Sequence, residues 1–257
     1  YGLSVIKNVS DYVYLTCDGV GEGETMSIYT IDDDYKIQKI WTNFYPNSIG
    51  LLYSTITDYL GFEINEGEFK VMSLSSFGKP IYEKELKKMF DINNFTINMD
   101  YFEFHKSPSK SFSKKLCEVF GEPYLNINEE ANFNKYADIA SSTQLILEHT
   151  MKNLIQKAIH LSGKRKVVLT GGVALNCKMI HSLSKQSIFE EMIVPPSPGD
   201  SGSAIGAANF AFLEKSKTKT LNFSNIFLGP KKNFINKKEN KDNFFSKINV
   251  TNDFIID

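Results

Sequence analysis

Residues 12–31, YVYLTCDGVGEGETMSIYTI, decide the fold of this chain. Within residues 12–17, Val13, Leu15 and Cys17 fall on one side of an extended backbone, because successive side chains of a strand point to opposite faces. This alternation predicts a strand that runs into an Asp-Gly pair. A glycine-bearing turn directly after a strand is where α/β sheets commonly bind ligands.

Two more strands are predicted after this one, at residues 24–31 and 35–42, with the acidic turn 32–34 between them. Three successive strands linked by short turns indicate an antiparallel meander. Residues 47–60 then predict a helix that ends at Gly61.

The centre of the chain is dominated by one long helix. Residues 61–80 predict a loop, and about 81–134 predict an insertion with short helices. Residues 135–161 predict the long helix, because apolar and small side chains recur at spacings of three and four, and Gly163 ends it. Its buried face is expected to carry Tyr136, Ala140, Thr143, Leu147, Met151, Leu154, Ala158 and Leu161.

The C-terminal part alternates short strands with helices. Residues 167–169 and 190–194 predict strands, 173–183 predict a helix, and the small-residue segment from Ser201 predicts another helix to about Leu213. After an antiparallel meander, this order indicates an α/β fold with a mixed sheet and flanking helices, of the ribonuclease-H-like type found in the lobes of actin-like ATPases.

Composition and domain organisation set further limits. The lobe is expected to cover residues 1–215, and residues 216–257, rich in Lys and Asn from Lys231 onward, are expected to be a linker or the start of another domain. The chain has 29 basic and 30 acidic residues, so it lacks the basic surface that a nucleic acid demands. No run of eighteen apolar residues predicts a membrane span, and no signal peptide is recognisable. Three widely spaced cysteines fit neither a disulfide framework nor a zinc pattern, which predicts a cytoplasmic location.

Three glycine-bearing turns each follow a predicted strand. In the first, residues 18–23, the backbone amides around Gly19 and Gly21 can cradle a phosphate, and Asp18 can hold a cation that neutralises it. The alternative is a tight hairpin turn with an exposed acid, because short glycine motifs recur freely.

The second turn, residues 170–176, has paired glycines at the start of a predicted helix. The partly positive N-terminus of such a helix attracts phosphate at Gly171 and Gly172. Asn176, about one helical turn in, can hydrogen-bond a ribose hydroxyl or an adenine edge. The alternative is a glycine-rich turn that only packs closely.

The third turn and a separate charged segment supply the remaining candidates. Asp200, in the turn 198–202, is either a metal ligand opposite Asp18 or the N-cap of the following helix. Lys70, in the segment 65–72, can meet a phosphate as a point charge, although a solvated charged loop is the alternative there.

Five motifs occur in one order along the chain: DGVGE, EGEFKVMSLSSFGKP, YADIASSTQ, LTGGVALNCK and VPPSPGDSGSAIGAA. Over about residues 12–212 this series resembles the N-terminal domain of the O-carbamoyltransferases of nodulation-factor, cephalosporin-type and aminoglycoside biosynthesis. One short glycine motif is weak evidence, whereas five in order are specific.

The resemblance implies an enzyme that makes carbamoyl adenylate from ATP and carbamoyl phosphate, and then moves the carbamoyl group to a hydroxyl of a small-molecule biosynthetic intermediate. In such enzymes an actin-like domain, similar to that of the tRNA threonylcarbamoyl-transfer enzyme, holds the adenylate with a divalent metal, usually iron. A C-terminal domain forms the adenylate.

On this resemblance, Asp18 and Asp200 match two aspartate metal ligands, and Asp18 is also expected to orient the acceptor hydroxyl. The residues expected to bind the nucleotide are Gly19, Gly21, Glu22, Lys70, Gly171, Gly172, Asn176 and Gly199.

The chain departs from the family pattern in three ways. The family has two histidines, four apart, just upstream of the DG turn, and this position precedes Tyr1. The segment SLSSFG stands where the family favours GLAPYG. The first actin-like lobe and the adenylate-forming domain are not among the 257 residues, so the chain is expected to be a fragment with little transfer activity of its own.

Two other functions fit similar glycine turns. An actin-like sugar or acid kinase would use them for ATP and transfer a phosphoryl group. A non-catalytic nucleotide-binding or scaffold lobe would use them only for packing, with Asp200 as a plain helix cap.

Overall fold

The computed structural model describes residues 2, 6, 8–106 and 110–215. Their centre is a five-stranded mixed sheet with the strand order β3-β2-β1-β6-β7. The predicted antiparallel meander is confirmed, with strands β1 (Tyr12–Gly21), β2 (Glu24–Ile31) and β3 (Ile37–Phe44). Strands β6 (Lys166–Thr170) and β7 (Glu191–Ile193) extend the sheet parallel to β1, so the chain has the predicted mixed α/β architecture.

The hairpin between β1 and β2 is longer than predicted. Gly21 still pairs with Glu24, and the turn between them consists only of Glu22 and Gly23. Both turn residues have positive φ, 51° and 96°, which is the conformation of a two-residue type I′ turn. The expectation that a loop begins at Asp18 is therefore wrong, although the register is irregular between Cys17 and Gly21.

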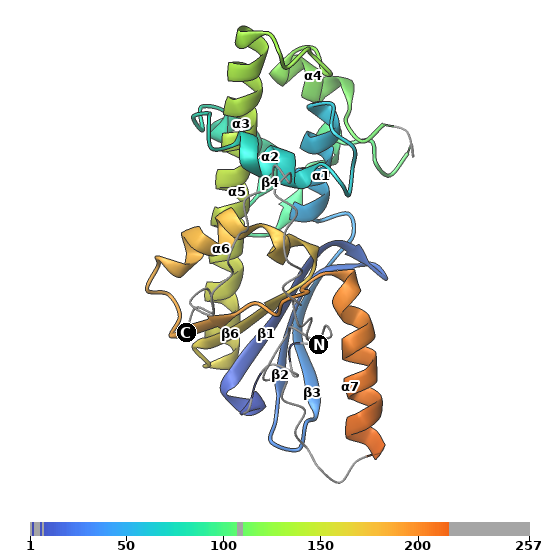
Figure 1. Ribbon diagram of the computed structural model, residues 1–257, viewed down its shortest axis with the longest axis vertical. Coiled ribbons are helices and arrows are strands. Elements are labelled where there is room, and N and C mark those ends of the chain that lie inside the picture. Colours follow the sequence, from blue (N-terminus) through green and yellow to red (C-terminus); the bar gives the residue numbers. More distant parts are fainter. Residues whose placement is uncertain (1, 3–5, 7, 107–109, 216–257) are drawn as a thin grey trace, which may run out of the picture. The chain divides into compact units, whose positions relative to one another are not determined.

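Three helices border the sheet. Helix α1 (Ile49–Tyr59) contacts β1, and helix α5 (Glu130–Ser162) contacts both β1 and α1. Helix α6 (Cys177–Ser184) connects β6 to β7 and packs on α5. Figure 1 shows α5 running from the helical part of the molecule down beside the sheet.

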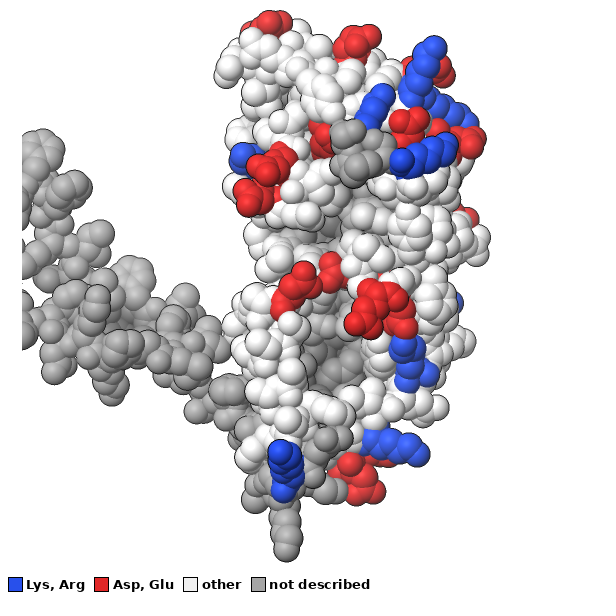
Figure 2. Space-filling model, turned by 90° about the vertical axis from the view of Figure 1, so that its right-hand side faces the viewer, with Lys and Arg blue, Asp and Glu red and all other residues white. Residues whose placement is uncertain are grey.

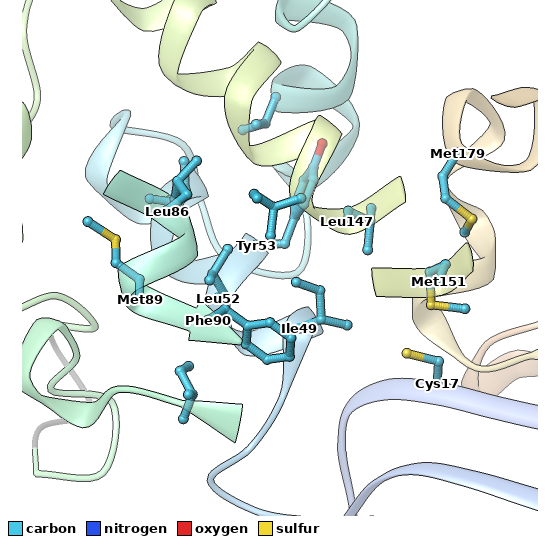
Figure 3. Packing of buried hydrophobic residues seen from close by; sticks show 14 of the residues in the cluster. Cys17, Ile49, Leu52, Tyr53, Leu86, Met89, Phe90, Leu147, Met151 and Met179 are labelled. Atoms are coloured by element: carbon cyan, nitrogen blue, oxygen red, sulfur yellow. The ribbon is translucent and has the colours of Figure 1, made fainter. Parts of the chain in front are cut away.

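The long helix confirms the predicted periodicity but begins five residues earlier than expected. Seven of the eight residues expected on its inner face are buried, whereas Leu161 is 46% exposed. Gly163 ends the helix with φ of +70°, as predicted. In Figure 3, Met151 of this helix lies near Cys17 of β1 and Met179 of α6, so strand and helices share one core.

The predicted loop 61–80 contains a helix, α2 (Glu68–Leu74), which corrects that prediction. Its two buried residues, Val71 and Leu74, are three positions apart and form its inner face. A seven-residue helix is not stable by itself, and α2 packs along α5. Its stability therefore comes from tertiary contacts that a search for periodicity does not detect.

Residues 81–134 form short elements around the start of α5. They comprise helix α3 (Glu83–Met89), a small hairpin of β4 (Phe90–Asp91) and β5 (Thr96–Ile97), and helix α4 (Lys114–Phe120). Their buried side chains, including Leu86, Phe102 and Phe120, belong to the same core as the sheet and α5.

A second, smaller apolar cluster covers the other face of the sheet, with Tyr12, Tyr14, Ile31 and Val168 among its members. The predicted C-terminal helix is present as α7 (Ser203–Lys215). The predicted linker 216–257 lies outside the described residues. Among the helices that are described, none is long and apolar enough to cross a membrane.

Candidate functional site

The three predicted glycine-bearing turns meet at one edge of the sheet. Strands β1 and β6 are parallel, with Thr16 opposite Thr170, so the residues that follow both strands emerge at the same edge. A Cβ atom added to Gly172 would lie 2.8 Å from Oδ1 of Asp18. A Cβ atom on Gly199 would lie 3.7 Å from Cα of Gly172. The prediction that these turns gather is therefore confirmed.

Gly171 fixes the second turn against its neighbours. It has φ of +95°, and an added Cβ would lie 2.1 Å from the carbonyl oxygen of Cys17, so no side chain fits. Its N–H donates to the carbonyl of Pro198 at 2.8 Å, which ties the second turn to the third. This N–H is already hydrogen-bonded within the protein. Gly171 therefore has a role in the packing of the turn, whether or not the turn also binds a ligand.

Asp18 is half-buried and restrained from two sides. Its Oδ1 accepts the N–H of Gly19 at 2.8 Å, and its carbonyl accepts the hydroxyl of Ser48 at 3.1 Å. Ser48 is the N-cap of α1, and its Oγ accepts the N–H of Leu51 at 3.0 Å. The start of α1 therefore holds the Asp18 backbone, and the Gly19 amide points to Asp18 instead of being open to a phosphate.

The hairpin end borders a cavity of about 410 Å³ on the sheet face opposite the main core. Figure 2 shows acidic side chains gathered at mid-height of the molecule, beside a hollow. At this cavity, hydrogen bonds from Lys39 and Ser27 lower the pKa of Glu24. The residues that line the cavity are Thr16, Asp18, Gly21, Glu22, Glu24, Thr25, Tyr29 and Lys39.

Asn176 has a different place from the one predicted. A 3-10 turn, η4 (Gly172–Leu175), precedes it, and α6 begins directly after it. Its Oδ1 accepts the N–H of Met179 at 2.8 Å, so Asn176 is the N-cap of α6 and not a residue one turn inside a helix. Its amide also pairs with Gln144 of α5, a residue that sequence reasoning missed. A glutamine among the buried positions of α5 was the available signal, because buried polar groups need partners.

Lys70 is not joined to the three turns by any contact found among the described residues. It is exposed, with its ammonium 5.7 Å and 5.9 Å from the ring centres of Phe62 and Phe69. The lysine beside the second turn is Lys178, which donates to Ser75 Oγ at 2.8 Å and Ser76 Oγ at 3.2 Å.

Burial lowers the pKa of Lys178, while the Glu148 carboxylate opposes this shift. Sequence reasoning missed this lysine, although LTGGVALNCK ends on it and both serines belong to SLSSFG. Through these bonds the two serines hold the start of α6.

Asp200 is exposed and is the first residue of a 3-10 turn, η5 (Asp200–Gly202), with Gly199 at the cap position. No side chain caps this turn, so Asp200 is not the N-cap of η5, and its role as the cap of the following helix stays a prediction. Among the described residues, no three His, Cys, Asp or Glu side chains gather as a metal site would require. Asp18 and Asp200 therefore do not make a complete metal centre with other described residues.

Comparison with known proteins identifies relatives of this chain. The family described as "Carbamoyltransferase N-terminus" matches residues 8–209. The uncharacterized protein sll1178 of Synechocystis sp. is 35% identical over 198 residues, which cover 76% of this chain and 32% of that protein. The nodulation protein NolNO of Sinorhizobium fredii is 27% identical over 198 residues, covering 76% of this chain and 27% of that protein.

The nodulation protein NolO of Bradyrhizobium diazoefficiens is 28% identical over 166 residues, covering 63% of this chain and 28% of that protein. The chain thus spans about a third or less of the length of these three relatives. The matched residues include the whole sheet, the long helix and all three turns. The chain therefore belongs to the family of carbamoyltransferase N-terminal domains.

Proposed function

We propose that the protein transfers a carbamoyl group from carbamoyl adenylate, made from ATP and carbamoyl phosphate, to a hydroxyl of a small-molecule biosynthetic intermediate. Family membership over residues 8–209 supports carbamoyl transfer. The observation that carries the site is the contact between Gly172 and the Asp18 carboxylate, which brings a glycine turn and an acid together.

The strand order supports a lobe of the ribonuclease-H-like, actin-like type. Three antiparallel strands are followed by two strands parallel to the first, with the long helix between the two groups. In such a lobe the ends of β1 and β6 face the nucleotide, so the adenylate would lie along the turns at Asp18, Gly172 and Gly199.

The transfer step forms one bond and breaks one. The oxygen of the acceptor hydroxyl bonds to the carbamoyl carbon, and the bond from that carbon to the phosphate oxygen breaks, so AMP leaves with the bonding electron pair. The hydroxyl proton passes to a base, and we assign its first acceptor to Asp18. Because Oδ1 of Asp18 is held by Gly19, its other oxygen is the better placed to accept that proton.

The other predicted site residues differ in their relation to Asp18 and the second turn. Gly171 and Asn176 shape the turn that would hold the nucleotide, and Gly21 and Glu22 border the cavity next to Asp18. Lys70 has no described contact with this edge of the sheet. A divalent metal bound by Asp18 and Asp200 stays a prediction that needs ligands beyond the described residues, and no step here depends on it.

The test is an assay of the full-length protein with ATP, carbamoyl phosphate and a panel of hydroxyl acceptors, measuring AMP and carbamoylated product. We expect Asp18→Asn to lower the transfer rate at least 100-fold, since general-base contributions are about 100- to 10,000-fold. Asp33→Asn, in the exposed turn between β2 and β3, is the matched control and is expected to leave the rate unchanged.

The same assay separates the alternative functions. A kinase would form phosphorylated product from ATP without carbamoyl phosphate. A scaffold lobe would give no product that depends on Asp18. Either result would contradict the proposal. The isolated 257-residue chain is expected to show little transfer.

A further inference from the structure

The backbone of Asp18 lies where the strand pairing of β1 becomes irregular. The last pair between β1 and β6 joins Thr16 to Thr170, and the register with β2 shifts between Cys17 and Gly21. Regular pairing thus ends just before Asp18 on one side of the strand and skips it on the other. Because a backbone carbonyl away from water needs a partner, this position depends on a restraint from outside the sheet.

Ser48 supplies that restraint. It is fully buried, its hydroxyl donates to the Asp18 carbonyl at 3.1 Å, and the same oxygen accepts the N–H of Leu51 at 3.0 Å. A hydroxyl has one hydrogen and a backbone N–H can only donate, so the direction of both bonds is fixed. Ser48 therefore caps α1 and holds the end of β1 through one oxygen atom.

The start of α1 also packs directly on the peptide that follows Asp18. A Cβ atom on Gly50 would lie 2.8 Å from both the carbonyl oxygen of Asp18 and the backbone nitrogen of Gly19. No side chain fits there unless this peptide shifts, because packed atoms do not approach so closely. The peptide is thus held by a hydrogen bond from Ser48 and by van der Waals contact with Gly50.

Asn47 in turn anchors Ser48. The carbonyl of Asn47 accepts the hydroxyl of Thr25 at 2.6 Å and Nδ2 of Asn43 at 3.2 Å. Its Oδ1 accepts the N–H of Ile97 at 3.0 Å. These three partners belong to β2, β3 and β5, so Ser48 follows a residue that is tied to three strands. Such a rigid support is what a positioning group requires.

We propose that Ser48 is a positioning residue, which holds the Asp18 backbone so that the Asp18 carboxylate reaches the acceptor hydroxyl in the transfer step. The inference rests on the role of Asp18 proposed above, and it assigns the geometry of that carboxylate to α1, which lies outside the three glycine turns. Aspartate has a short side chain, so a shift of its backbone moves the carboxylate by a similar amount. A displacement of about 1 Å can cost about 100-fold in rate.

The first test is the transfer rate of the full-length protein with ATP, carbamoyl phosphate and a hydroxyl acceptor. Ser48→Gly removes the hydroxyl that holds Asp18, while glycine remains a tolerated N-cap residue, and we expect kcat to fall about tenfold. Ser113→Ala is the matched control. Ser113 is also buried directly before a helix, α4, and its hydroxyl donates to the Asp100 carbonyl at 2.7 Å. This control is expected to lower the melting temperature and leave kcat unchanged.

Gly50→Ala disturbs the same peptide by the opposite means. It keeps the Ser48 hydroxyl, and alanine favours a helix more than glycine does, but its methyl group would push the Asp18 carbonyl away. We expect kcat of this variant to fall at least tenfold.

A double-mutant cycle separates positioning from a purely structural role. If Ser48 and Gly50 act through the Asp18 carboxylate, each substitution should change kcat less than about twofold when Asp18→Asn is already present. A purely structural contribution would lower kcat by the same factor in both backgrounds, and that result overturns the inference.

The outcomes also separate this inference from the proposed function. An unchanged kcat in both Ser48→Gly and Gly50→Ala overturns the positioning role and leaves the proposed function standing. An unchanged kcat in Asp18→Asn overturns the proposed role of Asp18, and this inference with it. Rates are expressed per folded molecule, and thermal unfolding identifies a variant that does not fold, in which case the cycle with the other variant decides.

Discussion

At the scale of single residues, two glycines with similar backbone conformations have different surroundings. Gly171 and Gly163 have φ of +95° and +70°, so both disfavour any other residue. A Cβ atom on Gly171 would lie 2.1 Å from the carbonyl oxygen of Cys17, whereas one on Gly163 would meet no atom within 4 Å. Any other residue would be strained by the positive φ at both positions, but its side chain would clash with neighbouring atoms only at Gly171, in the second turn.

This difference predicts the effect of two matched substitutions. Gly163→Ala is expected to cost about 1–2 kcal/mol of unfolding free energy, the usual cost of a left-handed conformation for an L-residue. Gly171→Ala adds an overlap with the backbone of β1 and is expected to cost about 1–3 kcal/mol more. Urea unfolding of both variants measures the difference, and equal losses would contradict the described packing of the turn.

At the scale of elements, the side chain of Glu24 on β2 links a second residue of β2 to a residue of β3. Its Oε2 accepts from Ser27 at 2.6 Å, and its Oε1 forms an ion pair with Lys39. These bonds lower the pKa of Glu24 in the folded chain. A lowered carboxyl pKa stabilises the fold at pH values above the unfolded pKa, and this contribution is lost as the pH falls through the folded pKa.

A double-mutant cycle with Glu24→Gln and Lys39→Met tests this contribution. The pair is exposed and screened by solvent, so the coupling energy at pH 7 is expected to be small and favourable. It should stay constant down to about pH 4.3, the ordinary glutamate pKa, and shrink below it. A coupling energy that increases as the pH falls would contradict the predicted pH dependence.

At the scale of the whole molecule, the reactivity of the three cysteines shows how the core opens. Cys17 lies fully buried between sheet and helices, near Met151 in Figure 3, and burial raises its pKa. Cys117 is partly buried, and burial raises its pKa too. Cys177 is exposed at the start of α6.

Thiol labelling is therefore expected to proceed in the order Cys177, Cys117, Cys17. Because only the thiolate reacts, and the Cys17 thiol is both covered and protonated, its modification should require global unfolding. Its labelling rate should then rise with urea concentration in parallel with the unfolding rate. Mass spectrometry of labelled peptides over time gives the order, and Cys17 labelling as fast as Cys177 would contradict a closed core.

The sequence by itself determined the features that have a strong local signal or a signal shared by the whole family. The alternation of Val13, Leu15 and Cys17 and the spacing of three and four in the long helix follow from which side chains must be buried. Glycine at 163 ends that helix because few other residues adopt its backbone angles. The order of five motifs identified the family.

The tertiary structure decided everything that depends on a partner distant in sequence. It made residues 68–74 a helix by packing them on α5, placed Asn176 at a helix cap facing Gln144, and put Lys178 instead of Lys70 beside the turn. It also brought Gly172 against Asp18, 154 positions earlier in the chain. Local preferences differ by less than about 1 kcal/mol per residue, so such contacts outweigh them, and no local pattern records which contacts will form.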